Sequence, residues 1–307
     1  MSRVLVTPRS LTRGASPEVD RLRAAGFEVV LAPAGRQPTE DELVELVTGC
    51  AGWLAGVEPI TARVLAAAAD LRVISRNGAG IDNVDLDAAA AGGVEVVRAA
   101  GANARGVAEL AITLMLSALR GVPASSAALR DGRWERTLGR EAAGLTLGVV
   151  GAGAIGRQTL ALGAALGMRG LASDPYPAAG LDVPFVSVPE LLAQADVVSL
   201  HAPAPADGSV PVDAGALASA REGLVLVNTA RAGLVDDAAV LAALEDGRLA
   251  AYATDVFAVE PPPPSPLLDH PAVIATPHIG GYTRESVARA ASAAVDNLLE
   301  VLGRPVS

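Results

Sequence analysis

The sequence predicts an α/β protein made of two doubly wound domains, each with a parallel sheet covered by helices. The length of 307 residues exceeds an ordinary single core and favours two domains of roughly 100–200 residues each. Short β-branched runs alternate with alanine-rich helical stretches along the whole chain, as is typical of parallel α/β sheets. A polar, charged and glycine-containing stretch, residues 130–144, divides this alternation into two series.

The first series begins with a β-branched run at the N-terminus. Its predicted strands are residues 3–7, 28–31, 52–55, 72–75 and 95–97. Helices are predicted at residues 18–25, 40–48 and 61–68. Residues 103–120 form one long predicted helix, with Asn103 placed to cap its free N–H groups.

The second series follows the same plan. Its predicted strands are residues 145–150, 169–173, 197–200, 224–228, 251–255 and 273–276. Helices lie between most of them, for example at residues 155–166 and 238–246, and a last helix covers residues 283–302. The proline run at residues 260–264 must be a loop, because proline neither donates to a ladder nor continues a helix.

Composition excludes several classes of protein. Apolar residues make up 51% and charged residues 19%, which excludes a disordered chain. The net charge of −10 argues against nucleic acid as the main partner. Charged residues and glycines interrupt the apolar runs well short of the ~20 residues that a membrane span needs, so no membrane partner is expected.

The termini and the few cysteines and histidines give further expectations. The N-terminus resembles a strand rather than a signal peptide, so we expect a cytoplasmic protein. Cys50 is the only cysteine, which rules out an internal disulfide and a cysteine-built zinc site. With three histidines in all, no metal site is expected.

A glycine motif predicts a dinucleotide site. Gly151, Gly153 and Gly156 have the G-x-G-x-x-G spacing, follow a predicted strand and open a predicted helix. Gly151 permits the tight turn, Gly153 lets the backbone approach a pyrophosphate, and Gly156 lets helix and strand pack closely. Free N–H groups at the helix start, which includes Ala154 and Ile155, would bind the phosphates.

Asp174 completes the motif. It ends the next predicted strand, 18 residues after Gly156, where an acidic side chain accepts hydrogen bonds from the adenosine ribose. A carboxylate there repels a 2′-phosphate, so NAD is favoured over NADP. The alternative is a structural glycine turn followed by a surface aspartate.

Three candidate catalytic residues follow predicted strands. Arg231 follows the strand at 224–228, Glu260 follows 251–255, and His278 follows 273–276. Ligands of open α/β sheets bind at the carboxyl ends of the strands, so these three side chains are expected at one rim. Taken singly, each has a structural alternative: a surface arginine, a solvated glutamate and a turn-capping histidine.

Together these segments resemble the D-isomer-specific 2-hydroxyacid dehydrogenases. The resemblance rests on residues 77–85, 103–109, 151–156 with Asp174, 228–236, 255–261 and 276–280, which occur in the family's order. It implies that Arg231 binds the substrate carboxylate and polarises the 2-oxo group. It also implies that His278 is the acid or base at the substrate oxygen, held in its protonated form by Glu260.

The resemblance further implies cofactor contacts. Asp255 would bind the nicotinamide carboxamide, and His201 would contact the cofactor rather than act in proton transfer. The remaining implied cofactor contacts are Pro203, Thr229, Ala230 and Gly280.

The resemblance also implies a domain plan. A flavodoxin-like substrate domain, residues 1–98 plus 282–307, would carry an inserted Rossmann NAD-binding domain, residues 99–281. Catalysis would take place in the cleft between them. The family is usually a homodimer through the inserted domain, and the segment 130–144 is expected in that interface.

The candidate substrate residues resemble those of phosphoglycerate dehydrogenases. The loop at Asn77, Gly78 and Ala79 would offer backbone N–H groups to the substrate carboxylate. Arg76 would hold a phosphate, and Arg136, with Arg105 as a third candidate, would supply further positive charge.

Two of these arginines have structural alternatives. Arg136 could instead pair with Glu135 or Asp131 at the surface, and Arg105 could face solvent. Gly106 stands where the family often has serine, and the end at Ser307 leads us to expect no C-terminal regulatory domain.

The leading expectation is therefore an NAD-dependent dehydrogenase for a small 2-hydroxy or 2-oxo acid with a second anionic group, such as 3-phosphoglycerate. The alternatives are a broad glyoxylate or hydroxypyruvate reductase and, from another class, an NADH-sensing corepressor.

Overall fold

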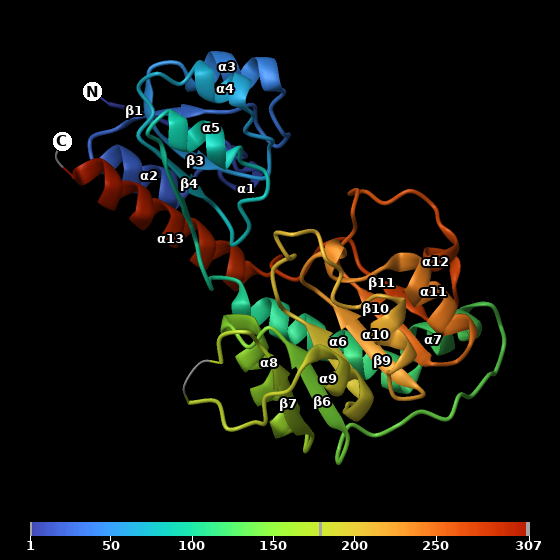
Figure 1. Cartoon of the computed structure of the whole chain (residues 1–307). Coiled ribbons are helices and arrows are strands. Elements are labelled where there is room, and N and C mark those ends of the chain that lie inside the picture. Colours follow the sequence, from blue (N-terminus) through green and yellow to red (C-terminus); the bar gives the residue numbers. More distant parts are fainter. Residues whose placement is uncertain (1, 178–179, 305–307) are drawn as a thin grey trace. The chain divides into compact units, whose positions relative to one another are not determined.

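The computed structural model describes residues 2–177 and 180–304, which form two compact units (Figure 1). Unit 1 comprises Met1–Asn103 and Arg284–Ser307, and unit 2 comprises Ala104–Thr283. The chain thus leaves unit 1 after Asn103 and returns after Thr283, where the sequence predicted boundaries after residues 98 and 281.

Unit 1 is built on a five-stranded parallel sheet in the order β2-β1-β3-β4-β5. This is the flavodoxin-like order of doubly wound folds. The strands are β1 (Arg3–Val6), β2 (Glu28–Leu31), β3 (Cys50–Ala55), β4 (Val73–Arg76) and β5 (Glu95–Arg98).

Helices cover both faces of this sheet. One face carries α3 (Glu40–Val47), α4 (Ala62–Ala66) and α5 (Leu86–Ala91), and the other carries α1 (Arg9–Thr12), α2 (Pro17–Ala24) and α13 (Arg284–Gly303). Because successive strand residues point to opposite faces, Leu5 joins one core and Val4 joins the other. Figure 1 shows α13 running beside α2, so the second face is completed by residues distant in sequence.

Unit 2 is built on a six-stranded parallel sheet in the order β11-β10-β9-β8-β6-β7. A single parallel bridge between Ala172 and Phe185 extends it beyond β7. The order reverses between β6 and β8, and such a switch point is where open α/β sheets bind ligands. The strands are β6 (Thr146–Val150), β7 (Arg169–Ser173), β8 (Val197–Leu200), β9 (Leu224–Asn228), β10 (Leu249–Thr254) and β11 (Val273–Ala275).

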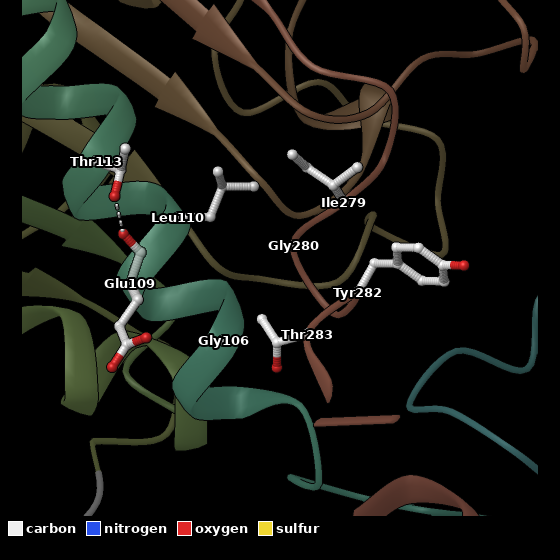
Figure 2. Close-up of a pocket in the computed structure, with 8 residues that line it drawn as sticks. All are labelled: Gly106, Glu109, Leu110, Thr113, Ile279, Gly280, Tyr282 and Thr283. Atoms are coloured by element: carbon white, nitrogen blue, oxygen red, sulfur yellow. Dashed lines mark hydrogen bonds between the residues drawn. The ribbon is translucent and has the colours of Figure 1, made fainter. Parts of the chain in front are cut away.

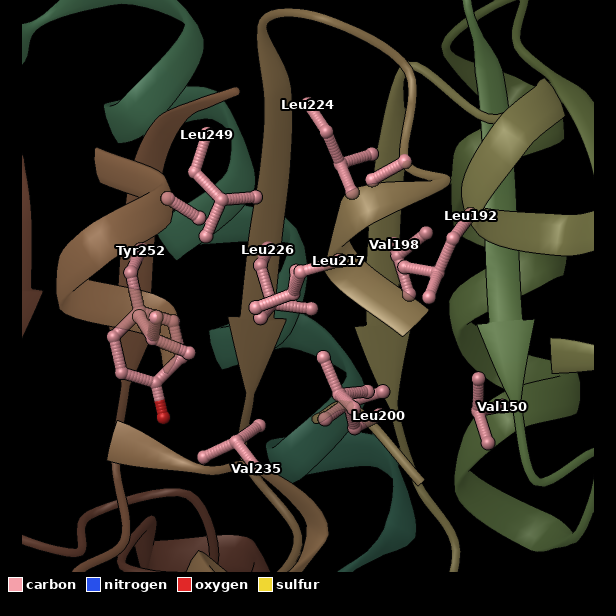
Figure 3. Close-up of a cluster of buried hydrophobic side chains, with 14 of the residues drawn as sticks. Val150, Leu192, Val198, Leu200, Leu217, Leu224, Leu226, Val235, Leu249 and Tyr252 are labelled. Carbon is pink, nitrogen blue, oxygen red and sulfur yellow. The ribbon is translucent and has the colours of Figure 1, made fainter. Parts of the chain in front are cut away.

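Two cores lie on the two faces of this sheet. One face packs against α6 (Ala104–Arg120) and α8 (Ala154–Ala165). The other packs against α9 (Val188–Gln194), α10 (Ala214–Ala218), α11 (Asp237–Glu245) and α12 (Pro266–Asp269). Figure 3 shows this second core, where Leu226 and Tyr252 from neighbouring strands pack with Leu217 of α10.

The two parallel-sheet domains confirm the predicted fold class, while two local predictions were wrong. Asn103 does not cap α6 with its side chain, because its buried Oδ1 has no hydrogen-bond partner within the described residues. The sequence also missed α7 (Val122–Arg130), which begins after a left-handed Gly121 and has a proline in its first turn. Residues 131–145 then contain neither helix nor strand.

In the described parts of the chain, no single helix is long and apolar enough to cross a membrane. The pair α6 and α7 passes that test only jointly, and it bends by 63° at the break between its helices.

Candidate active site

The glycine loop lies at the switch point of unit 2. It connects β6 to α8, and the chain after β8 runs directly beside it: His201 N–H donates to Val150 O at 2.7 Å. The first residues of α8, Ala154 and Ile155, leave N–H groups without intrahelical partners, as every helix start does. The loop can therefore offer backbone donors to a phosphate at the place predicted for the cofactor.

The three glycines differ in what surrounds them. A Cβ on Gly151 (φ +92°) would lie 2.6 Å from Ala202 N, and one on Gly156 would lie 2.1 Å from Gly151 O. A Cβ on Gly153 would meet nothing within 4 Å. Two glycines are thus required by packing, and the third faces open space where a ligand can approach the backbone.

Asp174 follows β7 and braces this loop. Its Oδ2 accepts a hydrogen bond from Ala152 N–H at 2.8 Å, and its Oδ1 accepts one from Tyr176 N–H at 2.8 Å. The carboxylate therefore stands beside the glycine loop, and each oxygen keeps capacity for a further donor such as a ribose hydroxyl.

Two buried polar atoms of unit 2 have no partner among the described residues. They are Nδ1 of His201 and Oγ1 of Thr229, which follow β8 and β9. Burial lowers the pKa of His201 to about 3, so the ring is neutral, and its Nε2 lies 2.9 Å from Ser199 Oγ. Unpartnered buried polar atoms at the carboxyl edge fit residues that bind a polar ligand.

Arg231 is placed by a turn closed by Asn228, which sequence reasoning missed. Asn228 is fully buried; its Nδ2 donates to Arg231 O at 2.9 Å, and its Oδ1 accepts from Ala230 N–H at 3.1 Å. The Arg231 guanidinium donates to Ala230 O at 2.7 Å. Pro203 lies exposed in the loop after β8.

His278 and Glu260 form a direct pair. His278 Nδ1 lies 2.8 Å and 2.9 Å from the two carboxylate oxygens of Glu260. A carboxylate only accepts, so Nδ1 carries a hydrogen and Nε2 is left for chemistry. His278 has φ 52°, the one positive φ outside glycine in the described chain, and such strain is concentrated at functional sites.

Asp255 holds the loop that carries His278. The buried Asp255 carboxylate accepts from Thr276 Oγ1 at 2.7 Å, Ile279 N–H at 2.8 Å and Gly280 N–H at 2.8 Å. A Cβ on Gly280 would lie 3.1 Å from Asp255 Oδ2, so a larger residue at position 280 would crowd the Asp255 carboxylate. The structure therefore gives Asp255 a loop-positioning contact that the sequence did not predict.

The candidate substrate loop lies at the carboxyl edge of unit 1. Arg76 ends β4, and its Nη1 donates to Asn77 O at 2.5 Å. Gly78 N–H donates to Arg76 O, so this N–H is not offered outward as predicted, whereas Ala79 O accepts from Arg98 at 3.4 Å. Asn77 Oδ1 is buried without a partner in the described residues.

The other candidate arginines, Arg136 and Arg105, lie at the surface. Arg133, not Arg136, pairs with Asp131 and Glu135, at 3.2 Å and 2.6 Å. Arg136 lies exposed in the segment between α7 and β6. Arg105 faces solvent, as its alternative had it, and pairs there with the exposed Glu109 one turn along α6, at 2.5 Å.

A surface pocket of about 380 Å³ lies beside this site and shares only Gly280 with the predicted residues (Figure 2). Its walls come from α6 and the segment after His278. They are Gly106, Glu109, Leu110, Thr113, Ile279, Gly280, Tyr282 and Thr283. The pocket is thus lined by residues that come directly after His278 in the chain, and neither His278 nor Glu260 lines it.

The fold and site define a class: an NAD-binding α/β protein with a histidine–carboxylate pair at the carboxyl edge of its sheet. The family model for the NAD binding domain of D-isomer specific 2-hydroxyacid dehydrogenases matches residues 112–280. The chain therefore belongs to this family, which confirms the resemblance and the NAD cofactor expected from its sequence.

Individual relatives agree. D-3-phosphoglycerate dehydrogenase of Mycobacterium tuberculosis is 42% identical over 260 residues, 82% of this chain and 49% of the relative. Hydroxypyruvate reductase of Thermotoga maritima is 36% identical over 250 residues, 80% of this chain and 82% of the relative. The TT0316 protein of Thermus thermophilus matches in structure with TM-score 0.89 and 39% identity, over 98% of this chain and 97% of that one. The chain spans about half the length of the phosphoglycerate dehydrogenases it matches.

Proposed function

We propose that this chain is an NAD-dependent D-2-hydroxyacid dehydrogenase, or 2-oxoacid reductase, for an acid with a second anionic group such as 3-phosphoglycerate or phosphohydroxypyruvate. The observation that carries the reaction class is the His278–Glu260 pair, held on a loop by Asp255 in a domain that binds NAD. In this proposal unit 1 is the substrate domain and unit 2 the cofactor domain.

The pair determines which nitrogen of His278 can exchange a proton with the substrate. Because Nδ1 of His278 donates to Glu260, Nε2 gives a proton to the substrate oxygen during reduction or takes it during oxidation. Glu260 fixes the orientation of the ring. The guanidinium of Arg231 binds the substrate carboxylate through a two-pronged hydrogen bond and polarises the 2-oxo group.

The cofactor residues are proposed from the same edge. The loop of Gly151, Gly153 and Gly156 would hold the pyrophosphate, Asp174 the adenosine ribose, and the atoms left unpartnered on His201 and Thr229 the nicotinamide half. Bound NADH supplies the hydride that substrate C2 receives in the reductive direction.

The second anionic group is proposed from Arg76 in unit 1, with Arg136 as a further cation. The chain carries a net charge of −10, so an anionic substrate needs local positive charge. The alternative is a broad glyoxylate or hydroxypyruvate reductase, in which the bond from Arg76 to Asn77 O only shapes the loop.

The test is NADH oxidation with phosphohydroxypyruvate, hydroxypyruvate and glyoxylate, compared as kcat/KM. A preference for the phosphorylated acid of about 100-fold, or ~2.7 kcal/mol, supports the proposed substrate class. Turnover without preference supports the broad reductase. NADH binding without turnover of any 2-oxo acid would overturn the enzyme proposal in favour of an NADH sensor.

Replacing the proposed acid checks the mechanism. His278→Ala is expected to lower kcat by at least ~100-fold, the usual contribution of a positioned acid, while NADH still binds. The measurement is steady-state kinetics alongside fluorescence titration of NADH. His270→Ala is the control, since His270 only caps the end of α12. Normal turnover in His278→Ala would remove this residue from the mechanism.

We also propose a homodimer in the cytoplasm. The support for the dimer is the exposed apolar surface of α7 and the following segment, where Leu129, Trp134 and Leu138 are 59%, 82% and 99% exposed.

A further inference from the structure

Two arginines stand side by side at the carboxyl edge of unit 1. Arg76 and Arg98 are the last residues of β4 and β5 and are register partners in this parallel pair. Neighbouring strands lie about 4.8 Å apart, and directly paired residues project from the same face. Only Arg76 belongs to a motif that points to anion binding in the sequence.

Both guanidinium groups reach the same loop. Nη1 of Arg76 donates to Asn77 O at 2.5 Å, and Nη1 of Arg98 donates to Ala79 O at 3.4 Å. The loop backbone between these two carbonyls is fastened to the end of β5, because Ala99 N–H donates to Gly78 O at 3.1 Å. Two cationic side chains thus contact this loop, and a backbone hydrogen bond to the end of β5 holds the loop in place.

The position of Arg98 is also fixed from the other side. Asn297 of α13 donates through Nδ2 to Arg98 O at 3.1 Å. The side chain is exposed, and no carboxylate lies within ion-pair distance of it among residues 2–177 and 180–304. By contrast, the exposed Arg304 binds Glu95 at the opposite end of β5.

This arrangement favours an anion. Like charges directly opposite in a sheet destabilise it, so a negative charge beside Arg98 would stabilise this end of the strand pair. The 3.4 Å bond to a neutral carbonyl is weak, and a charged oxygen is the stronger acceptor. A tetrahedral dianion presents three oxygens and can accept from both guanidinium groups at once.

We propose that Arg98 and Arg76 together form an anion subsite against the loop at residues 77–80, and that it binds the phosphate-type second anionic group of the substrate. This inference rests on the proposed dehydrogenase function and adds Arg98 as a residue that determines specificity.

The test measures binding without turnover. Isothermal titration of the NADH-loaded chain compares 3-phosphoglycerate with D-glycerate, which differ by the phosphate and are both already reduced. The wild type is expected to bind 3-phosphoglycerate at least 10-fold more tightly. Arg98→Gln should reduce this ratio by about 10-fold, the effect of losing one hydrogen bond between charged groups, and Arg98→Lys should restore part of it.

Arg304→Gln is the matched control. It removes the same charge from unit 1 at the opposite end of β5 and should leave the ratio unchanged. An equal loss in Arg98→Gln and Arg304→Gln would show a general field effect and overturn the role of Arg98. Equal wild-type affinity for the two acids, or binding of neither, would overturn the subsite itself. Parallel NADH oxidation by glyoxylate then decides separately whether the dehydrogenase proposal stands.

Discussion

Substitutions of single glycines in the 151–156 loop are expected to affect protein stability and NADH affinity differently. Gly153→Ala should change the free energy of unfolding by less than ~0.5 kcal/mol, because its Cβ would meet nothing within 4 Å. The same methyl group projects where a phosphate would approach, so the Kd for NADH should rise at least ~10-fold. Denaturant unfolding and NADH titration measure the two effects.

Gly156→Ala provides the contrast. Its Cβ would stand 2.1 Å from Gly151 O, and crowding of this kind costs ~1–3 kcal/mol or more. A stable Gly153→Ala variant with normal NADH affinity would contradict the phosphate role of this loop.

The neutral ring of His201 makes the stability of unit 2 depend on pH. Its folded-state pKa of about 3 lies below the unfolded value of ~6.5, so the unfolded chain binds the proton first. The contribution is fully present above pH 6.5 and is lost as the pH falls from 6.5 toward 3. The slope is up to ~1.4 kcal/mol per pH unit.

Urea unfolding of the wild type and of His201→Gln between pH 7 and pH 4.5 checks this dependence. The variant should lose less stability over that range. Equal losses in both proteins would mean that His201 is protonated in the folded state.

Sequence reasoning located residues whose chemistry is visible in their side chains. Arg231, Glu260 and His278 were found because each follows a predicted strand, and strand ends share one edge. Asn228 and the loop contact of Asp255 were missed, because both depend on which backbone N–H groups fold toward them. Arg98 was missed since only the strand register places it beside Arg76.

At the scale of elements, the loop after β11 depends on one carboxylate. Asp255→Asn places an amide opposite one of the N–H groups of Ile279 and Gly280 and leaves that donor unsatisfied. We expect a loss of ~1–3 kcal/mol in unfolding free energy and, because His278 is displaced, a larger fall in kcat than in NADH affinity.

Unfolding curves and the split between kcat and KM test this expectation. Asp207→Asn is the control, because its carboxylate accepts from Ser209 in the exposed loop after β8, away from the His278 loop. Unchanged kcat in Asp255→Asn would contradict the positioning of His278 by this residue.

Strands were the easiest elements to predict. Buried parallel strands are short, continuous apolar runs, and such runs stand out between alanine-rich helices. The break between α6 and α7 was harder, because Gly121 and Pro123 interrupt an otherwise continuous helical pattern by only a few residues. Side-chain capping by Asn103 failed because a suitable residue type does not ensure a suitable geometry.

At the scale of the whole molecule, the apolar surface after α7 predicts association. The segment between α7 and β6 is bound to the core of unit 2 near its C-terminal end, because Arg140 Nη2 donates to the buried Asp196 at 2.8 Å. Burial alone would raise the pKa of Asp196, but hydrogen bonds from Thr146 N–H and Arg140 outweigh it and lower the pKa. The Asp196 carboxylate therefore stays charged, and its ion pair with Arg140 attaches the C-terminal end of the apolar segment to unit 2.

Leu138 is 99% exposed in the single chain and would be buried in the proposed dimer. Leu138→Asp should therefore convert the dimer to a monomer, because an unpaired charge is costly to bury. Size-exclusion chromatography with light scattering measures the change. Leu86→Asp, which alters an exposed leucine of unit 1, should leave the dimer intact. A monomeric wild type would contradict the proposed association.

The two-domain organisation was predictable from the alternating pattern and the length, because each sheet needs its own pair of helical layers. The cation pair at one edge of unit 1 was not, because it arises from residues 22 positions apart that meet only in the folded sheet.

The return of the chain to unit 1 has a consequence for its synthesis. One face of the first sheet is covered by α13, where Leu298 packs against Gly52 and Ala294 O accepts from Ser75. A ribosome must add the residues of unit 2, Ala104–Thr283, before this helix emerges, which takes roughly 10–40 s at 5–20 residues per second. During that interval the part of this face that α13 later covers stays exposed, so it is then that the chain is most open to chaperones and to aggregation.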